Sequence, residues 1–70
     1  MSEDLKNLVG KHVLVHVGVA AKVAGHLTEV KILKVSPSGE YVKLQKYRFD
    51  GSTYVEWERS RDVELVEVLD

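Results

Sequence analysis

The stretch Val30–Trp57 constrains the fold most strongly, because two turn-forming segments divide it into three runs of β-branched and aromatic residues. The first segment, Ser36–Gly39 (SPSG), combines a proline that presets φ with a glycine that accepts a left-handed conformation. The second is the Asp50-Gly51 dipeptide, which is typical of tight β-hairpins because their turns need positive φ. The stretch therefore predicts a three-stranded antiparallel meander.

The second turn predicts which residues of its two strands face each other. With the aspartate and glycine as its only turn residues, Leu44 lies opposite Trp57 and forms an apolar core pair. The same register places Lys43 opposite Glu58, as an oppositely charged pair on the other face.

The first turn, read as a three-residue loop of Pro37–Gly39, pairs Val35 with Tyr41 and Ile32 with Leu44. Because directly opposed residues share a face, the two registers divide the meander into two sides. The inward side is predicted to hold Val30, Ile32, Val42, Leu44, Val55 and Trp57, with Lys46 as the polar exception. The outward side is predicted to hold Leu33, Val35, Tyr41, Lys43, Tyr47 and Tyr54.

Two elements are predicted before the meander. Ser2–Leu8 has acidic residues at its start and leucines at helical spacing, which predicts a short helix that ends at Gly10. Lys11–Val19 alternates with period two and predicts a strand with valines on one face. Residues 20–25 fit either a broad loop or a loose, bent strand, and both alternatives stay open.

The last elements complete an all-β plan. Glu58–Asp62 is a short polar segment that fits a single 3₁₀ turn. The final run, VELVEVL, changes the phase of its alternation between Leu65 and Val66, which predicts a bulge or a bend. Five strands with short hairpins and a one-turn helix before the last strand predict a five-stranded, SH3-like small barrel with a short N-terminal helix.

Length and composition bound the class of protein. The 70 residues allow one small domain over 1–70, and 44% hydrophobic with 30% charged residues predict a chain that folds. The formal net charge of −1 gives no global attraction to nucleic acid or membrane, so nucleic-acid binding needs a local patch. The lack of cysteine excludes disulfides and thiolate chemistry. Without an apolar run long enough for a signal peptide or a membrane span, we expect a cytoplasmic protein with no membrane partner.

The ionisable residues do not combine into a reactive site. His12 and His16 lie about 13 Å apart on one strand, at roughly 3.3 Å per residue, so they cannot share a metal ion. His26 adds a single further ligand, and the glutamates of the last two strands predict ion pairs with nearby lysines and arginines. We therefore expect no enzyme, no catalytic or metal-binding residue, no cofactor and no small-molecule substrate.

Two families share this plan of strands. The span Leu5–Leu27 resembles the opening of Sm-like proteins in its short helix, its strand entered through Gly-Lys and its Gly-x-Leu entry to the next strand. Ser36–Gly39 stands where the RNA-binding aspartate and asparagine of that family would follow, so no Sm RNA-binding residue carries over. The span Glu29–Leu69 resembles Tudor or KOW type SH3-like barrels in its tight hairpin, aromatic strands and terminal ELVEVL strand. Tudor domains hold methylated side chains in an aromatic cage, and the tyrosines of the meander are the comparable residues.

The outward side of the meander is the predicted site. We expect a non-catalytic binding or assembly module that contacts a protein partner or a second copy of itself. The alternative is RNA or DNA binding, in which tyrosines stack on bases while lysines and an arginine contact phosphates. Whether this side is exposed or is covered by the N-terminal helix and the last strand stays open. The predicted partner-binding residues are Leu33, Val35, Tyr41, Lys43, Tyr47, Arg48 and Tyr54.

Overall fold

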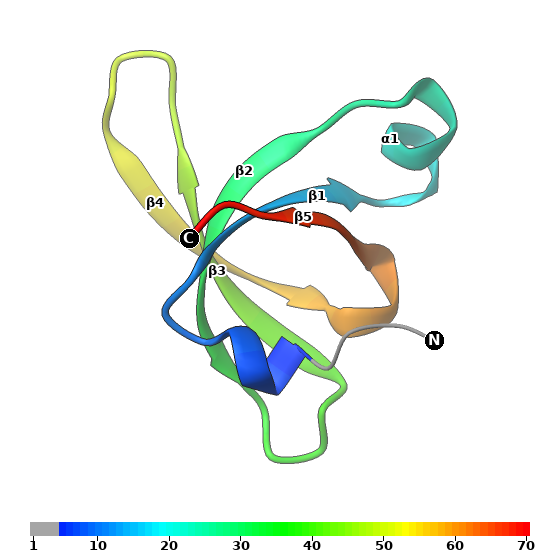
Figure 1. Cartoon of the computed structure of the whole chain (residues 1–70), viewed down its shortest axis with the longest axis vertical. Coiled ribbons are helices and arrows are strands. Elements are labelled where there is room, and N and C mark those ends of the chain that lie inside the picture. Colours follow the sequence, from blue (N-terminus) through cyan, green and yellow to red (C-terminus); the bar gives the residue numbers. More distant parts are fainter. Residues whose placement is uncertain (1–4) are drawn as a thin grey trace.

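The structure is a computed structural model that describes residues 5–70, and most of these residues belong to one antiparallel β-sheet (Figure 1). Its strands are β1 (His12–Val17), β2 (Thr28–Val35), β3 (Tyr41–Tyr47), β4 (Thr53–Arg59) and β5 (Val63–Val68). The helices are η1 (Leu5–Leu8), α1 (Val19–Ala24) and η2 (Ser60–Asp62), and η1 and η2 are 3₁₀ helices. The all-β prediction and the meander, now β2–β4, are confirmed.

The strand order is β4-β3-β2-β1-β5, so the chain returns at its end to place β5 beside β1 (Figure 1). This order leaves β4 and β5 as the two edges of the sheet. The sheet therefore does not close into the predicted barrel. Among the described residues, no helix is long and apolar enough to cross a membrane.

The hydrophobic core lies on one side of the bent sheet, which we call the inner face. Alternation along the strands places apolar side chains on this face, as the period-two pattern of β1 predicted. Four of the predicted inward residues, from β2 and β3, are fully buried. The buried core residues are Leu8, Val13, Val15, Val30, Ile32, Val42, Leu44 and Val63.

The N-terminal helix closes one end of this core. It is a 3₁₀ helix, and its Leu8 is buried among the core residues. Backbone hydrogen bonds join the following turn to β2, with Gly10 N donating to Ile32 O (2.7 Å) and Ile32 N to Lys11 O (3.1 Å). The predicted helix start at Ser2 lies outside the described residues.

The segment between β1 and β2 forms helix α1, whereas the sequence had suggested a broad loop or a loose, bent strand there. Its VAAKVA sequence is half alanine, the best helix former. Gly25 ends the helix in the left-handed conformation (φ 71°) and its N–H donates to Lys22 O (3.2 Å). No residue of α1 is buried, so local propensity and this cap define the helix.

The β2–β3 hairpin follows the predicted register only in its inner part. Ile32 lies opposite Leu44 as predicted, but the register then shifts at a bulge around Leu33. Val35 consequently lies opposite Val42 rather than Tyr41, and it packs against the core. The outward position predicted for Val35 is therefore wrong, because the bulge moves it to the other face.

The β3–β4 hairpin differs from the predicted register by one residue. Arg48 N donates to Ser52 O (2.9 Å), which brings Phe49 into the turn beside Asp50 and Gly51. The Asp50 carboxylate accepts hydrogen bonds from Ser52 N (2.9 Å) and Ser52 Oγ (2.6 Å). Gly51 has a φ of 88°, as the third residue of such a loop requires.

This shift reverses the faces of β4. Lys43 lies opposite Trp57 and Leu44 lies opposite Glu56, so the predicted Leu44–Trp57 and Lys43–Glu58 pairs are wrong. A slip of one residue sends every side chain of a strand to the opposite face. Trp57 is 50% exposed, and Val55 is exposed with it.

The predicted phase change in the last strand is confirmed. Leu65 lies opposite Val15 and Glu67 lies opposite Leu14, which leaves Val66 as an extra residue between them. The short polar segment before β5 forms η2, as predicted.

A pair of substitutions tests the β3–β4 register. We expect Leu44→Ala to lower the free energy of unfolding by about 2–5 kcal/mol, because it opens a cavity in the core. We expect Trp57→Ala to lower it by less than about 1 kcal/mol, since surface side chains contribute little. Urea denaturation followed by circular dichroism measures both, and Ile32→Val, at about 1 kcal/mol, serves as a milder core variant. A Trp57→Ala variant as unstable as Leu44→Ala would show that the indole belongs to the core.

Candidate functional site

The outer face of the meander, opposite the core, gathers basic and aromatic side chains. Opposed residues share a face, so Lys43 lies beside Trp57, and Tyr41 beside Arg59. The β2 strand adds Lys31 opposite Gln45, and Lys34 opposite Lys43. We call this surface the aromatic face, and its members are Lys31, Lys34, Tyr41, Lys43, Tyr47, Trp57 and Arg59.

The two glutamates of β4 do not share this face. Glu56 lies opposite Leu44 and Glu58 opposite Val42, which directs both toward the inner face. There the Lys46 ammonium binds Glu56 Oε1 at 2.8 Å and Glu58 Oε2 at 2.6 Å, with only 12% of its side chain exposed. The lysine predicted as the polar exception of the inward side thus holds both carboxylates of β4 away from the aromatic face.

The pKa of Lys46 reflects this environment. Burial is the largest single effect and lowers the pKa, but hydrogen bonds and charge from Glu56 and Glu58 outweigh it. The net result is a pKa raised above the ordinary value of 10.5. Lys46 therefore remains charged at neutral pH.

Within residues 5–70, the cations of the aromatic face have no such partners. Among the residues that the structure describes, none of Lys31, Lys34, Lys43 and Arg59 forms an ion pair. The Lys43 ammonium lies 6.0 Å from the centre of the Trp57 ring, at the outer limit of a cation–π contact. These charges are available to a ligand.

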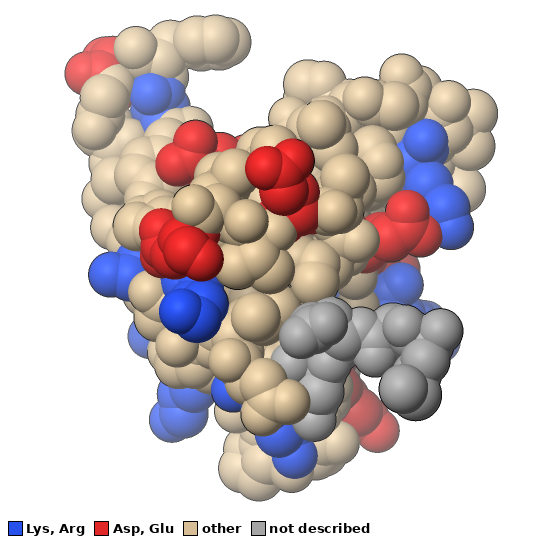
Figure 2. All heavy atoms as spheres, viewed as in Figure 1, with Lys and Arg blue, Asp and Glu red and all other residues tan. Residues whose placement is uncertain are grey.

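Acidic residues occupy the opposite end of the sheet's outer face. Glu67 and Glu29 lie on either side of Leu14, and Glu64 lies opposite His16. Figure 2 shows acidic atoms over the area where β5 and the C-terminus lie in Figure 1. A net charge near zero therefore conceals a separation of charge: the basic residues lie on β2–β4, and the acidic residues Glu29, Glu64 and Glu67 lie on the two strands that flank β1.

The aromatic side chains are accessible. Tyr41 is 43% exposed and Tyr47 is 41% exposed, so neither η1 nor β5 covers this face. A hollow lies at each end of β3, one lined by Tyr41, Glu40 and both Arg59 and Arg61. The hollow at the other end is lined by Tyr47, Arg48, Phe49 and Tyr54.

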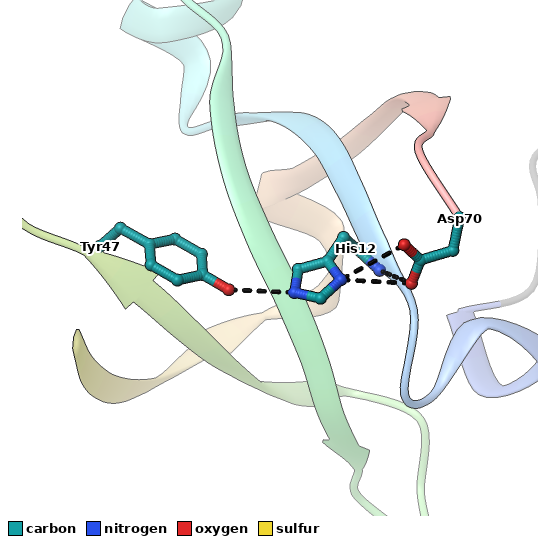
Figure 3. A network of polar contacts seen from close by, with 3 residues as sticks. All are labelled: His12, Tyr47 and Asp70. Carbon is teal, nitrogen blue, oxygen red and sulfur yellow. Dashed lines mark hydrogen bonds and ion pairs between the residues drawn. The ribbon is translucent and has the colours of Figure 1, made fainter. Parts of the chain in front are cut away.

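A polar network crosses the outer face from the end of the chain to β3 (Figure 3). His12 of β1 lies between Asp70 and Tyr47, with Nδ1 3.2 Å from Asp70 Oδ2 and Nε2 3.1 Å from Tyr47 Oη. Asp70 Oδ2 also accepts the backbone N–H of His12 at 2.8 Å. This backbone hydrogen bond is the main cause that lowers the pKa of Asp70, and the His12 ring adds to it.

The predicted site residues divide between the two faces. Tyr41, Lys43 and Tyr47 lie on the aromatic face, whereas Leu33 is the half-buried residue of the bulge. Val35 packs on the core, and Tyr54 lies opposite Lys46 on the inner side of β4. Arg48 lies in the hairpin turn, with its guanidinium carbon 4.5 Å from the centre of the Tyr54 ring.

The sequence prediction missed two principal residues of this surface, Trp57 and Arg59. Both follow from the β3–β4 register, and the clue lay in Asp50-Gly51, which fits two different hairpin loops. With the glycine as the last of three turn residues, Trp57 turns outward.

Within residues 5–70, no group of three or more histidine, cysteine, aspartate or glutamate side chains is placed to hold an ion. A scan against family models and searches of curated proteins and solved structures find no match to the chain.

We expect Lys46→Met to lower the free energy of unfolding by about 1–2 kcal/mol at neutral pH, because the half-buried carboxylate of Glu58 and the exposed carboxylate of Glu56 lose their shared cation. The raised pKa of Lys46 means that its stabilising charge is fully present below pH 10.5 and is lost as the pH rises through the folded-state value. The difference between the variant and the wild type should therefore shrink as the pH rises above 10.5 and passes through the folded-state pKa.

Urea denaturation at neutral pH and at a series of pH values above 10.5 measures this effect. Lys22→Met is the matched control, because its ion pair with Glu64 is exposed and should contribute less than about 1 kcal/mol. A Lys46→Met protein as stable as the wild type at neutral pH would contradict a structural role for the cluster.

Proposed function

We propose that the protein is a non-catalytic binding module whose aromatic face binds single-stranded nucleic acid. The observation that carries the proposal is the β3–β4 register, which turns Trp57 and Arg59 outward and turns Glu56 and Glu58 inward. The resulting surface combines cations for phosphates with aromatic rings for bases.

Charge favours a polyanionic ligand. The four cations of the aromatic face have no acidic partner in the described chain, and the carboxylates of β4 are held by Lys46. A local basic surface attracts phosphates even when the net charge is near zero, because charges beyond about 8–10 Å are screened at physiological salt. The acidic residues on either side of β1, Glu29 on one side and Glu64 and Glu67 on the other, would keep the ligand on the basic part of β2–β4.

The aromatic rings favour unpaired bases. Tyr41 and Tyr47 stand six positions apart on β3, which is about 20 Å at ~3.3 Å per residue. Trp57 lies between them on the neighbouring strand, opposite Lys43. Successive bases of a single strand can stack on such a row, whereas the bases of a duplex are already stacked on each other.

A protein partner or a second copy of the chain is the alternative function. The open edges of β4 and β5 favour it, because unpaired strand edges can add a strand from another chain. The aromatic face itself argues against a symmetric dimer, since two copies would bring the same four cations together.

The strand order and the 3₁₀ helix before β5 support the resemblance to SH3-like small barrels under either function.

Binding of a fluorescent single strand of about 10 nucleotides, followed by anisotropy at low salt, tests the proposal. We expect Trp57→Ala to weaken binding by about tenfold, the loss of one stacking contact. Lys43→Gln should reduce the slope of log K against log salt by about 0.7, the value for one phosphate contact. Lys22→Gln is the control, because it removes one positive charge outside the aromatic face.

Two results would contradict nucleic-acid binding. One is a flat titration for single-stranded DNA and RNA at low salt. The other is equal weakening by Lys43→Gln and Lys22→Gln, which would indicate attraction without a site. A flat titration combined with a dimer in light scattering that Trp57→Ala dissociates would favour the alternative function.

A further inference from the structure

The His12 network joins three groups in the order carboxylate, imidazole and phenol (Figure 3). We propose that Tyr47 is a base-activated nucleophile that accepts an acyl group from an activated acyl donor, with His12 as its general base. Asp70 acts through His12 and is a positioning residue. This reactivity is independent of the nucleic-acid binding proposed above.

The carboxylate determines how protons are arranged in the network. An ionised carboxylate only accepts hydrogen bonds, so the His12 Nδ1 at 3.2 Å from Asp70 Oδ2 must carry a proton. In a neutral imidazole, Nε2 then has a free lone pair and accepts a hydrogen bond from the Tyr47 hydroxyl, whose oxygen lies 3.1 Å away. The same order of groups activates the nucleophile of serine hydrolases.

The backbone holds this arrangement in place. Leu69 N donates to His12 O (2.8 Å), and His12 N donates to Asp70 Oδ2 (2.8 Å). These two hydrogen bonds join residues 69 and 70 to both backbone polar groups of His12 on β1. The centres of the His12 and Tyr47 rings are 6.4 Å apart, and the ring planes are inclined by 29°. The direct contact between the two side chains is therefore the hydrogen bond of the Tyr47 hydroxyl.

The chemical step is a single acyl transfer. As Tyr47 Oη attacks the carbonyl carbon of the donor, its proton moves to His12 Nε2 and a new C–O bond forms. The bond from the carbonyl carbon to the leaving group breaks, and the leaving group departs with its electron pair. His12 then returns the proton to the leaving group, and Tyr47 retains the acyl group as an aryl ester.

Tyr47 is open to a donor, and the chain supplies its own control. Tyr41 is on the same strand, faces the same side and is exposed to nearly the same extent, 43% against 41% for Tyr47. No hydrogen bond to the Tyr41 hydroxyl occurs among the described residues. A difference in reactivity between the two phenols therefore reports on His12 and not on access.

The experiment treats the folded protein with N-acetylimidazole at neutral pH and measures acetylation of each tyrosine by peptide mass spectrometry. We expect Tyr47 to react about tenfold faster than Tyr41, below the 10²–10⁴ of enclosed enzyme sites because this site faces solvent. His12→Gln is the decisive variant, because its amide oxygen can still accept the Tyr47 hydrogen bond but cannot take the proton. It should reduce the Tyr47 rate to that of Tyr41.

Asp70→Asn tests the positioning role with a readout of its own. The ¹⁵N shifts of the His12 ring report which nitrogen carries the proton, and we expect the Asn variant to lose the preference for Nδ1–H. Equal rates for Tyr41 and Tyr47 in the wild type would overturn the proposal. An unchanged Tyr47 rate in His12→Gln, with the fold intact by circular dichroism, would also overturn it.

Discussion

The register of the β3–β4 hairpin determines which side chains of β4 face the core and which face solvent. It follows from a turn in which the Asp50 carboxylate accepts two hydrogen bonds from Ser52 while Gly51 adopts positive φ. Because side chains alternate along a strand, this one turn decides which side of β4 faces the core. It sends the indole of Trp57 to solvent and the carboxylates of Glu56 and Glu58 to the inner face. Both the fold and the proposed function depend on that choice.

The inner face accommodates this register through Lys46. Turning the half-buried Glu58 toward the hydrophobic core would be costly without a cation, because partly buried charges need partners. Lys46 reaches both carboxylates from β3, and their proximity keeps its own pKa raised despite burial. The ion cluster thus stabilises the register and clears the aromatic face of negative charge. Stability and the sign of the surface potential are therefore linked through one lysine.

Local patterns predicted the elements well and their mutual register less well. The alternation of Val13 and Val15, the 3₁₀ turn after β4 and the bulge at Val66 were all readable from short segments. Helix α1 was not, because a run of small residues without a buried face has no hydrophobic periodicity.

The faces of Val35 and Trp57 depend on a bulge and on a turn that each add one residue, and alternation alone does not reveal such additions. Tyr41, Lys43 and Tyr47 were placed on the correct face because their alternation along β3, the middle strand of the meander, contains no bulge. The joining of His12 to Asp70 and Tyr47 needs β1, β3 and the end of the chain to meet, which no short segment encodes.

Cross-strand nuclear Overhauser effects between β3 and β4 measure the register of this hairpin in solution. We expect backbone contacts that pair Lys43 with Trp57 and Leu44 with Glu56, together with contacts between the indole and the Lys43 side chain. Contacts that pair Leu44 with Trp57 and Lys43 with Glu58 would contradict this register. That result would return the indole to the core, place Glu58 among the cations and remove the basis of the proposed nucleic-acid surface.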